Sequence, residues 1–129
     1  MIYLDTSVLL AHLLAEDKTP PEKLWKETLV SSRLIEYEVW NRIHALGLRD
    51  SHGDTVRHAI AHLGLLELVS PVLTRALEPF PVGLRTLDAL HLATIIFLQD
   101  YAQNVQLATY DDRMLKAARK LHIPIYQLL

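Results

Sequence analysis

Four carboxylates lie where the chain passes from apolar segments into expected helices. Asp5 directly follows a short apolar run, and Asp111 follows another after a two-residue turn. Asp88 lies in the first turn of an expected helix, and Glu38 lies about two turns into another. Two such charges about 4 Å apart repel by roughly 4 kcal/mol at an effective dielectric constant of about 20. If the four converge, they therefore need protonation or a divalent cation between them.

A divalent cation would give this cluster a chemistry. Mg²⁺ and Mn²⁺ prefer oxygen ligands, and a bound ion activates water for attack on a phosphodiester. The alternative for each residue alone is structural, because an isolated Asp after a strand is most often a helix cap. Asp88 fits that alternative least well, since its apolar neighbours predict partial burial and a buried carboxylate needs a partner. His91, one turn further along, is one such partner.

The elements that would position these carboxylates alternate along the chain. Short apolar runs predict five strands, at residues 2–4, 28–31, 65–69, 105–108 and 123–126. Helical spacing predicts helices between these strands. The first runs from Thr6 or Ser7 to about residue 15, and a second, short helix begins at the segment Thr19-Pro20-Pro21-Glu22. The others cover about residues 32–46, 51–63, 71–78, 86–101 and 111–121. Ser51, Thr86 and Asp111 are the predicted caps of three helices, and Gly47 is the predicted stop of one.

This alternation predicts an α/β fold, with a mainly parallel sheet of about five short strands and helices on both sides. Nearly all residues of the strands are apolar, as expected when both faces of a sheet are covered. In such sheets, ligands bind beyond the carboxyl ends of the strands. Asp5, Glu38, Asp88 and Asp111 all belong to that edge, so we expect them to converge there.

Composition excludes several other chemistries. The length predicts one domain over residues 1–129, and an apolar half with a formal charge of -2 excludes disorder. The absence of Cys excludes a disulfide scaffold, a Cys-ligated zinc site and a Cys nucleophile. The near-neutral charge argues against a broad basic surface for nucleic acid, though not against a local one. We expect no leader, no membrane span and a cytoplasmic protein.

Other kinds of site fit the sequence less well. His58 and His62 have the i,i+4 spacing of zinc ligands, but no Glu follows His58 and a solvated helix face explains them better. A haloacid-type phosphatase needs a second Asp two residues after Asp5, where Ser7 stands. A receiver domain needs an acidic pair that is missing, and a Rossmann or P-loop protein needs glycines in the first turn, where none occurs.

Four segments together resemble the motifs of PIN-domain ribonucleases, and among these the VapC-type toxins of bacterial and archaeal toxin–antitoxin pairs. The segments are IYLDTS at residues 2–7, SRLIEYEV at 32–39, RTLDALHLAT at 85–94 and LATYDDR at 107–113. They occur in the family's order and spacing over essentially the whole chain, and the third is specific. The resemblance implies a PIN-like three-layer α/β/α fold and hydrolysis of RNA by metal-activated water, with Mg²⁺ or Mn²⁺ as cofactor.

By the same resemblance, Asp5, Glu38, Asp88 and Asp111 form an acidic catalytic quartet. Asp5 and Asp88 would be the core metal ligands, and Asp111 would hold a second metal or act through water. Glu38 would bind metal or orient the attacking water.

Two positions of the quartet have an acidic neighbour, and both alternatives stay open from the sequence. Glu36 competes with Glu38, which we favour for its place in the second segment. Asp112 competes with Asp111, which we favour because it directly follows a Thr-Tyr pair.

The resemblance also suggests supporting residues around the quartet. They are Thr6, Ser7, Thr109, Arg85, Arg113 and His91. The three hydroxyls could add contacts to the site, with capping or turn bonding as the alternative. The two arginines could hold phosphates, although exposed Arg is usually only solvated. The histidine could fix the orientation of Asp88, with an ordinary half-buried histidine as the alternative.

The family implies RNA as substrate, a protein antitoxin whose tail would cover the acidic edge, and a homodimer, with no membrane association. Two other functions remain open: a housekeeping PIN-type nuclease for RNA processing, and a catalytically silent PIN scaffold or binding module. An intact quartet argues against the scaffold, because a scaffold has no reason to keep mutually repelling carboxylates.

Overall fold

The computed structural model describes residues 1–101 and 103–129. The strands are β1 (Ile2–Leu4), β2 (Leu29–Ser32), β3 (Gly64–Leu66) and β4 (Gln106–Ala108). The helices are α1 (Thr6–Leu13), α2 (Leu34–Ala45), α3 (Arg49–Ala61), α4 (Ser70–Ala76), α5 (Thr86–Asp100) and α6 (Asp112–Lys120), with a short 3₁₀ helix, η1, at Glu22–Lys26. In the part of the chain that the structure describes, no helix is long and apolar enough to cross a membrane.

The strands form one parallel sheet in the order β3-β2-β1-β4. β1 lies inside the sheet, where Ile2 pairs with Leu29 of β2 and Tyr3 pairs with Leu107 of β4. Because all these strands are parallel, their carboxyl ends lie on one edge, which we call the carboxyl edge. Asp5 directly follows β1 there, as the sequence predicts.

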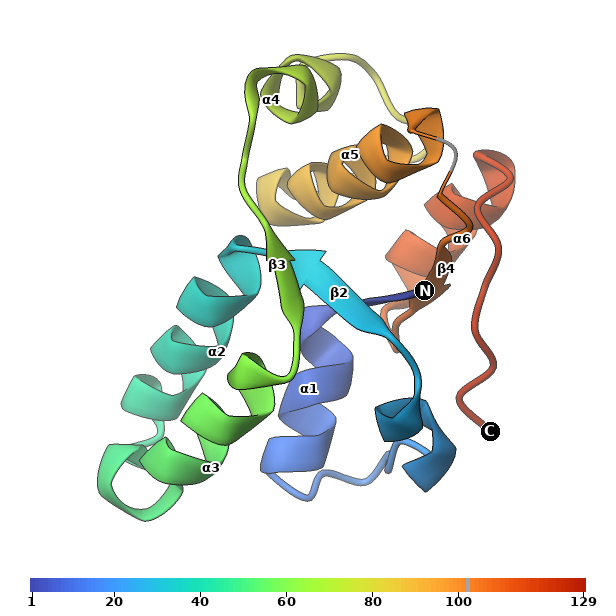
Figure 1. The fold of residues 1–129 in the computed structure, drawn as a ribbon. Helices are drawn as coiled ribbons and strands as arrows, with labels where there is room; N and C mark the ends of the chain where they lie inside the picture. Colours follow the sequence, from blue (N-terminus) through green and yellow to red (C-terminus); the bar gives the residue numbers. More distant parts are fainter. Residues whose placement is uncertain (102) are drawn as a thin grey trace.

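Helices cover both faces of the sheet, which gives the expected three-layer α/β/α architecture (Figure 1). Ile2 and Leu4 of β1 pack on one face in a core cluster with residues of α1, α2 and α3. Tyr3 points to the opposite face and packs with residues of α5 and α6. Alternate residues of a strand point to opposite faces, so one three-residue strand contributes to both halves of the core.

The prediction of a fifth strand at residues 123–126 is wrong. This segment forms a single β-bridge instead. Ile125 pairs with Leu107 of β4 in parallel, with hydrogen bonds from Leu107 N to the Pro124 carbonyl (2.8 Å) and from Tyr126 N to the Leu107 carbonyl (2.9 Å). Pro124 has no N–H to donate, so the ladder cannot continue towards the residues before Ile125. In the described residues the sheet therefore has four strands rather than five.

Three of the predicted helix caps differ from the structure. Asp5 caps α1 in place of Thr6 or Ser7, α3 begins at Arg49 before Ser51, and Thr86 is the first residue of α5 rather than its cap. Ser51 instead donates from its hydroxyl to the Leu48 carbonyl. The cap of α6 is as predicted, because the Asp111 side chain accepts a hydrogen bond from Met114 N (3.0 Å).

Two glycines of the α2–α3 pair should respond in opposite ways to the same substitution. Gly47 follows α2 with a positive φ of 67°, which an L side chain rarely adopts, so Gly47→Ala should cost about 1 kcal/mol. Gly53 lies inside α3, where an added Cβ would meet Arg57 Nη1 at 3.4 Å and Trp40 Cη2 at 3.7 Å. These contacts are ordinary, so Gly53→Ala should gain about 0.5–1 kcal/mol from helix propensity.

Chemical denaturation of the two variants beside the wild-type chain measures both changes. The free energy of unfolding should fall for Gly47→Ala and rise for Gly53→Ala. Equal signs for the two variants would contradict this account of the α2–α3 connection.

Candidate active site

The carboxyl edge gathers the predicted acidic residues from four different elements. Asp5 follows β1 and caps α1, Glu38 lies in the second turn of α2, Asp88 lies in the first turn of α5, and Asp111 caps α6. Asp5 and Asp88 are buried, while the side chains of Glu38 and Asp111 are partly exposed. The edge is therefore a half-buried acidic surface rather than a row of solvated carboxylates.

Asp5 is held by three hydrogen bonds to a single oxygen. Its Oδ2 accepts from Ser7 Oγ (2.6 Å), Ser7 N (3.3 Å) and Thr109 Oγ1 (2.7 Å). The Thr109 hydroxyl also accepts a hydrogen bond from Asp111 N (3.0 Å), so it links the carboxylate of Asp5 to the backbone of Asp111. Among the described residues, no hydrogen bond reaches Oδ1 of Asp5, and this oxygen is left for a further ligand.

Arg85 bridges two other carboxylates of the edge. Its Nε donates to Asp88 Oδ2 at 3.3 Å, and its Nη2 lies 3.5 Å from Asp111 Oδ2. The side chain of Arg85 is 74% exposed, so the pair with Asp88 is weak and readily exchanged. Hydrogen bonding and charge from Asp88, followed by the charges of Asp111 and Asp5, raise the pKa of Arg85.

The surroundings of Asp88 disfavour its ionised form. Burial raises the pKa of Asp88, and the negative charges of Asp111 and Asp5 raise it further. The hydrogen bond and charge of Arg85 oppose the increase without cancelling it. Burial and like charges both disfavour an ionised carboxylate, so any cation that replaced Arg85 here would be stabilised by the same field.

Glu38, and not Glu36, belongs to the acidic edge. Glu38 Oε1 accepts from Thr6 Oγ1 at 3.0 Å and lies 2.5 Å from His91 Nε2. Glu36 forms an ion pair of 2.6 Å with Arg33, which also binds Glu67. The two glutamates are two residues apart on one helix and therefore face different directions.

His91 binds Glu38 rather than Asp88. The sequence leaves two interpretations open, a partner that orients Asp88 and an ordinary half-buried histidine. In the structure His91 is fully buried, and its ring nitrogens bond to Glu38 and to the hydroxyl of Tyr3. Burial lowers the pKa of His91, but the hydrogen bond and charge of Glu38, together with the charges of Asp5 and Asp88, outweigh burial and raise the pKa overall. Sequence reasoning missed Tyr3, whose only signal was an aromatic residue within an otherwise aliphatic strand.

The remaining predicted residues lie on the surface of the protein. Asp112 and Arg113 are exposed in the first turn of α6, and neither forms an ion pair among the described residues. His58 and His62 are also exposed. Across residues 1–101 and 103–129, no three His, Asp or Glu side chains lie close enough to hold a metal ion.

The described residues of the acidic edge also contain no such group of three, and Arg85 lies between two of its carboxylates. The donor chemistry nevertheless fits a hard cation, because the available ligands are carboxylate and hydroxyl oxygens. Arg85 itself is evidence that this edge binds positive charge. The donor atoms at this edge are thus of the type that Mg²⁺ and Mn²⁺ prefer.

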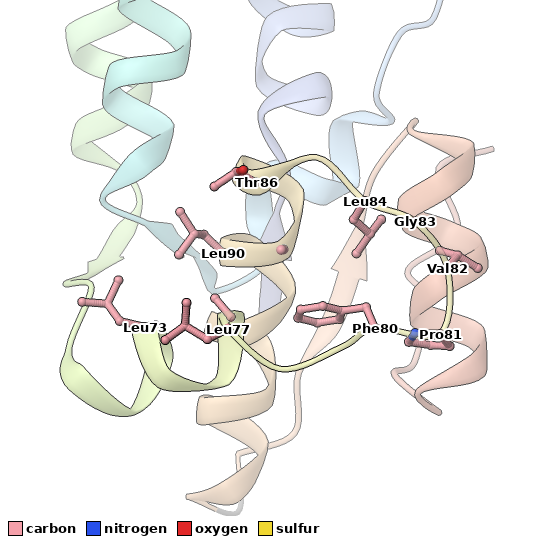
Figure 2. Close-up of a pocket in the computed structure, with 11 residues that line it drawn as sticks. Leu73, Leu77, Phe80, Pro81, Val82, Gly83, Leu84, Thr86 and Leu90 are labelled. Carbon is pink, nitrogen blue, oxygen red and sulfur yellow. The ribbon is translucent and has the colours of Figure 1, made fainter.

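An apolar groove of about 720 Å³ lies next to the acidic edge. Figure 2 shows Leu73 of α4, Leu77 directly after α4 and Leu90 of α5 around it, together with Phe80 from the connecting segment. Leu73 and Leu77 are exposed, and Thr86 at the start of α5 places one end of the groove beside Arg85. This face thus combines an apolar groove with a charged end.

A three-layer α/β/α domain with carboxylates gathered at the carboxyl edge is the class that this fold and this site define. The profile of the PIN domain family matches residues 2–120. The chain belongs to the PIN domain family.

Curated relatives of similar length place the chain among the VapC proteins. It is 36% identical to "Ribonuclease VapC46" of Mycobacterium tuberculosis (strain ATCC 25618 / H37Rv) over 132 residues, which cover 96% of this chain and 95% of the relative. It is 30% identical to "Ribonuclease VapC47" of M. tuberculosis (strain CDC 1551 / Oshkosh), over 94% of this chain and 92% of that protein.

A solved structure agrees with the fold. A chain of a "Toxin-antitoxin complex from Klebsiella pneumoniae" superposes with a TM-score of 0.64 at 16% identity, and the match covers 89% of this chain and 90% of that one.

The raised pKa of Asp88 predicts that this carboxylate destabilises the metal-free protein. The folded protein binds the Asp88 proton more tightly than the unfolded chain does, so ionisation of Asp88 above its raised pKa costs stability. In the presence of a chelator at pH 7, Asp88→Asn should raise the Tm by about 3–5 °C, or about 1 kcal/mol. The gain should shrink as the pH falls through the raised pKa towards 4.

Differential scanning calorimetry at several pH values measures this effect. Asp112→Asn is the matched control, because Asp112 is exposed, and its Tm should stay close to that of the wild type. A lower Tm for Asp88→Asn at pH 7 would mean that its bond to Arg85 outweighs burial and repulsion.

Proposed function

We propose that this protein is a metal-dependent endoribonuclease and the toxin of a type II toxin–antitoxin pair. The arrangement of Asp5, Asp88 and Asp111 around the cationic side chain of Arg85 carries the proposal, because it creates a site for positive charge at the carboxyl edge. Relatives named as VapC ribonucleases over nearly the whole chain support RNA as the substrate.

Asp5, Asp88 and Asp111 would hold Mg²⁺ or Mn²⁺ through their carboxylate oxygens. Such an ion would lower the pKa of a bound water and neutralise charge on the phosphodiester. Asp5 offers a fixed ligand, because Ser7 and Thr109 hold its other oxygen. Displacement of Arg85 from Asp88 would leave this exposed guanidinium free to bind a phosphate of the RNA.

Glu38 would orient the attacking water and accept its proton. The side chain is partly exposed, and one of its two oxygens is already fixed by Thr6 and His91. A carboxylate held in one orientation is a better general base than a mobile one, because the orientation entropy is lost before the reaction.

The two alternative functions are not favoured. A housekeeping nuclease would have no particular reason to align end to end with VapC ribonucleases. A silent scaffold would not need a desolvated Asp88, whose ionised form is unfavourable in the metal-free protein.

Metal-dependent RNA cleavage is the direct test of this function. Wild-type protein should cleave structured RNA in Mg²⁺ or Mn²⁺ and not in chelator. Asp5→Asn and Asp88→Asn should each reduce the rate by about 100-fold or more, because each removes charge from the site that stabilises the transition state. Glu36→Gln should stay close to wild type, since Glu36 binds Arg33 away from the edge.

Calorimetric titration with Mn²⁺ on the same samples separates binding from catalysis. Wild type should bind Mn²⁺, and both Asp variants should bind it more weakly. Equal cleavage in chelator, or full activity of both Asp variants, would refute the proposed site.

We propose further that the protein pairs with an antitoxin and forms a homodimer. The apolar groove between α4 and α5 supports a protein partner, because it exposes Leu73 and Leu77 and runs to the acidic edge. Light scattering on the purified chain should give twice the chain mass of 14.7 kDa. A mass of one chain at micromolar concentration would contradict the dimer and leave the nuclease proposal unaffected.

A further inference from the structure

A buried hydrogen-bonded chain connects the centre of the sheet to Glu38. Tyr3 of β1 and His91 of α5 are both 0% exposed. The Tyr3 hydroxyl lies 2.6 Å from His91 Nδ1, and His91 Nε2 lies 2.5 Å from Glu38 Oε1. The two rings meet edge to face, with centroids 5.7 Å apart and an angle of 77°. Both nitrogens of the buried imidazole are thus bonded to polar partners.

The direction of the chain follows from Glu38, because an ionised carboxylate can only accept a hydrogen bond. A neutral His91 ring therefore carries its proton on Nε2 and donates it to Glu38 Oε1. The unprotonated Nδ1 then accepts from the Tyr3 hydroxyl, whose oxygen accepts from Ser32 N at 3.2 Å. A protonated ring also donates from Nε2. Glu38 therefore accepts from His91 in either charge state of the imidazole.

The two carboxylate oxygens of Glu38 have different hydrogen-bond partners. Oε1 accepts from His91 and from Thr6 Oγ1, which come from α5 and α1. No hydrogen bond of the described residues reaches Oε2. One oxygen anchors the carboxylate to the sheet and its helices, and the other remains available for water.

Packing alone does not account for this chain of polar groups. Burying an imidazole and a phenol hydroxyl costs desolvation energy, which their mutual bonds only partly recover. Apolar side chains of similar size would fill the same volume without that cost. What the polar pair adds is a donor at a defined point opposite Glu38.

We propose that Tyr3 and His91 are positioning residues for Glu38: they fix one of its carboxylate oxygens so that the other orients the attacking water. This inference rests on the proposed nuclease function and extends it into the core. Tyr3 and His91 act only through Glu38 and touch neither RNA nor metal.

Steady-state cleavage kinetics in the wild-type and Glu38→Gln backgrounds test the inference. In the wild-type background, Tyr3→Phe should lower kcat by about 3–10-fold and His91→Leu by about 10–100-fold, with KM changed less than about threefold. His91→Gln should recover part of the loss, because its side-chain amide can donate near the position of Nε2. In the Glu38→Gln background, Tyr3→Phe should have no further effect on the residual rate.

Tyr110→Phe is the matched control for Tyr3→Phe. Tyr110 also has a buried hydroxyl, but that hydroxyl has no hydrogen-bond partner among the described residues. The control should keep the wild-type kcat. Circular dichroism and the Tm of each variant verify folding, and the conservative variants Tyr3→Phe and His91→Gln carry the test if His91→Leu does not fold.

A second readout does not require activity. The ¹⁵N spectrum of the His91 ring should report an unprotonated, hydrogen-bonded Nδ1 in a neutral ring, or protons on both nitrogens in a charged one. Glu38→Gln should shift the Nε2 signal, and Tyr3→Phe should shift the Nδ1 signal. Unchanged ring signals in both variants would overturn the hydrogen-bonded chain.

The outcomes separate this inference from the function on which it rests. If wild type does not cleave RNA, the proposed function fails and the positioning role fails with it. If wild type cleaves RNA but Tyr3→Phe lowers the rate equally with and without Glu38, only the positioning role fails, because the loss is then structural.

Discussion

Repulsion among carboxylates at one end of a parallel sheet is the constraint on which the rest of this structure depends. The parallel arrangement of β1 and β4 brings Asp5 and Asp111 to the same edge, and α5 adds Asp88. The carboxylates have different partners: hydroxyls of Ser7 and Thr109 bind Asp5, and a backbone N–H binds Asp111. Arg85 is shared between Asp88 and Asp111. Neutral donors leave the negative charge of Asp5 in place, and this charge is part of the basis of the proposed cation site.

The carboxyl edge also contains a carboxylate in an environment that is unfavourable for the stability of the fold. Asp88 is buried among like charges, and its one cationic partner among the described residues is an exposed arginine at 3.3 Å. A fold under selection for stability alone would replace such a residue. The two long contacts of Arg85 are readily exchanged, whereas short hydrogen bonds hold Asp5 in place.

The helix layers contribute more than cover for the sheet. α2 directs Glu38 to the edge and Glu36 to Arg33, so one turn of one helix separates a candidate catalytic group from a surface ion pair. α5 contributes Asp88 in its first turn and His91 one turn later, and these residues bind different partners. Together with Tyr3, the two helices extend the site from the edge into the core.

The sequence alone was enough to predict the α/β class, the order of the first four strands along the chain and the carboxylates that follow the apolar segments, because short apolar strands and capping carboxylates are local signals. It also favoured Glu38 and Asp111 over their acidic neighbours. Only the tertiary structure decided what each side chain touches: His91 binds Glu38 rather than Asp88, Arg85 bridges two carboxylates, Tyr3 joins the site, and residues 123–126 pair at one position instead of forming a strand. These contacts join residues up to 88 positions apart, and no local pattern encodes the distance between side chains that meet only when helices pack across a sheet.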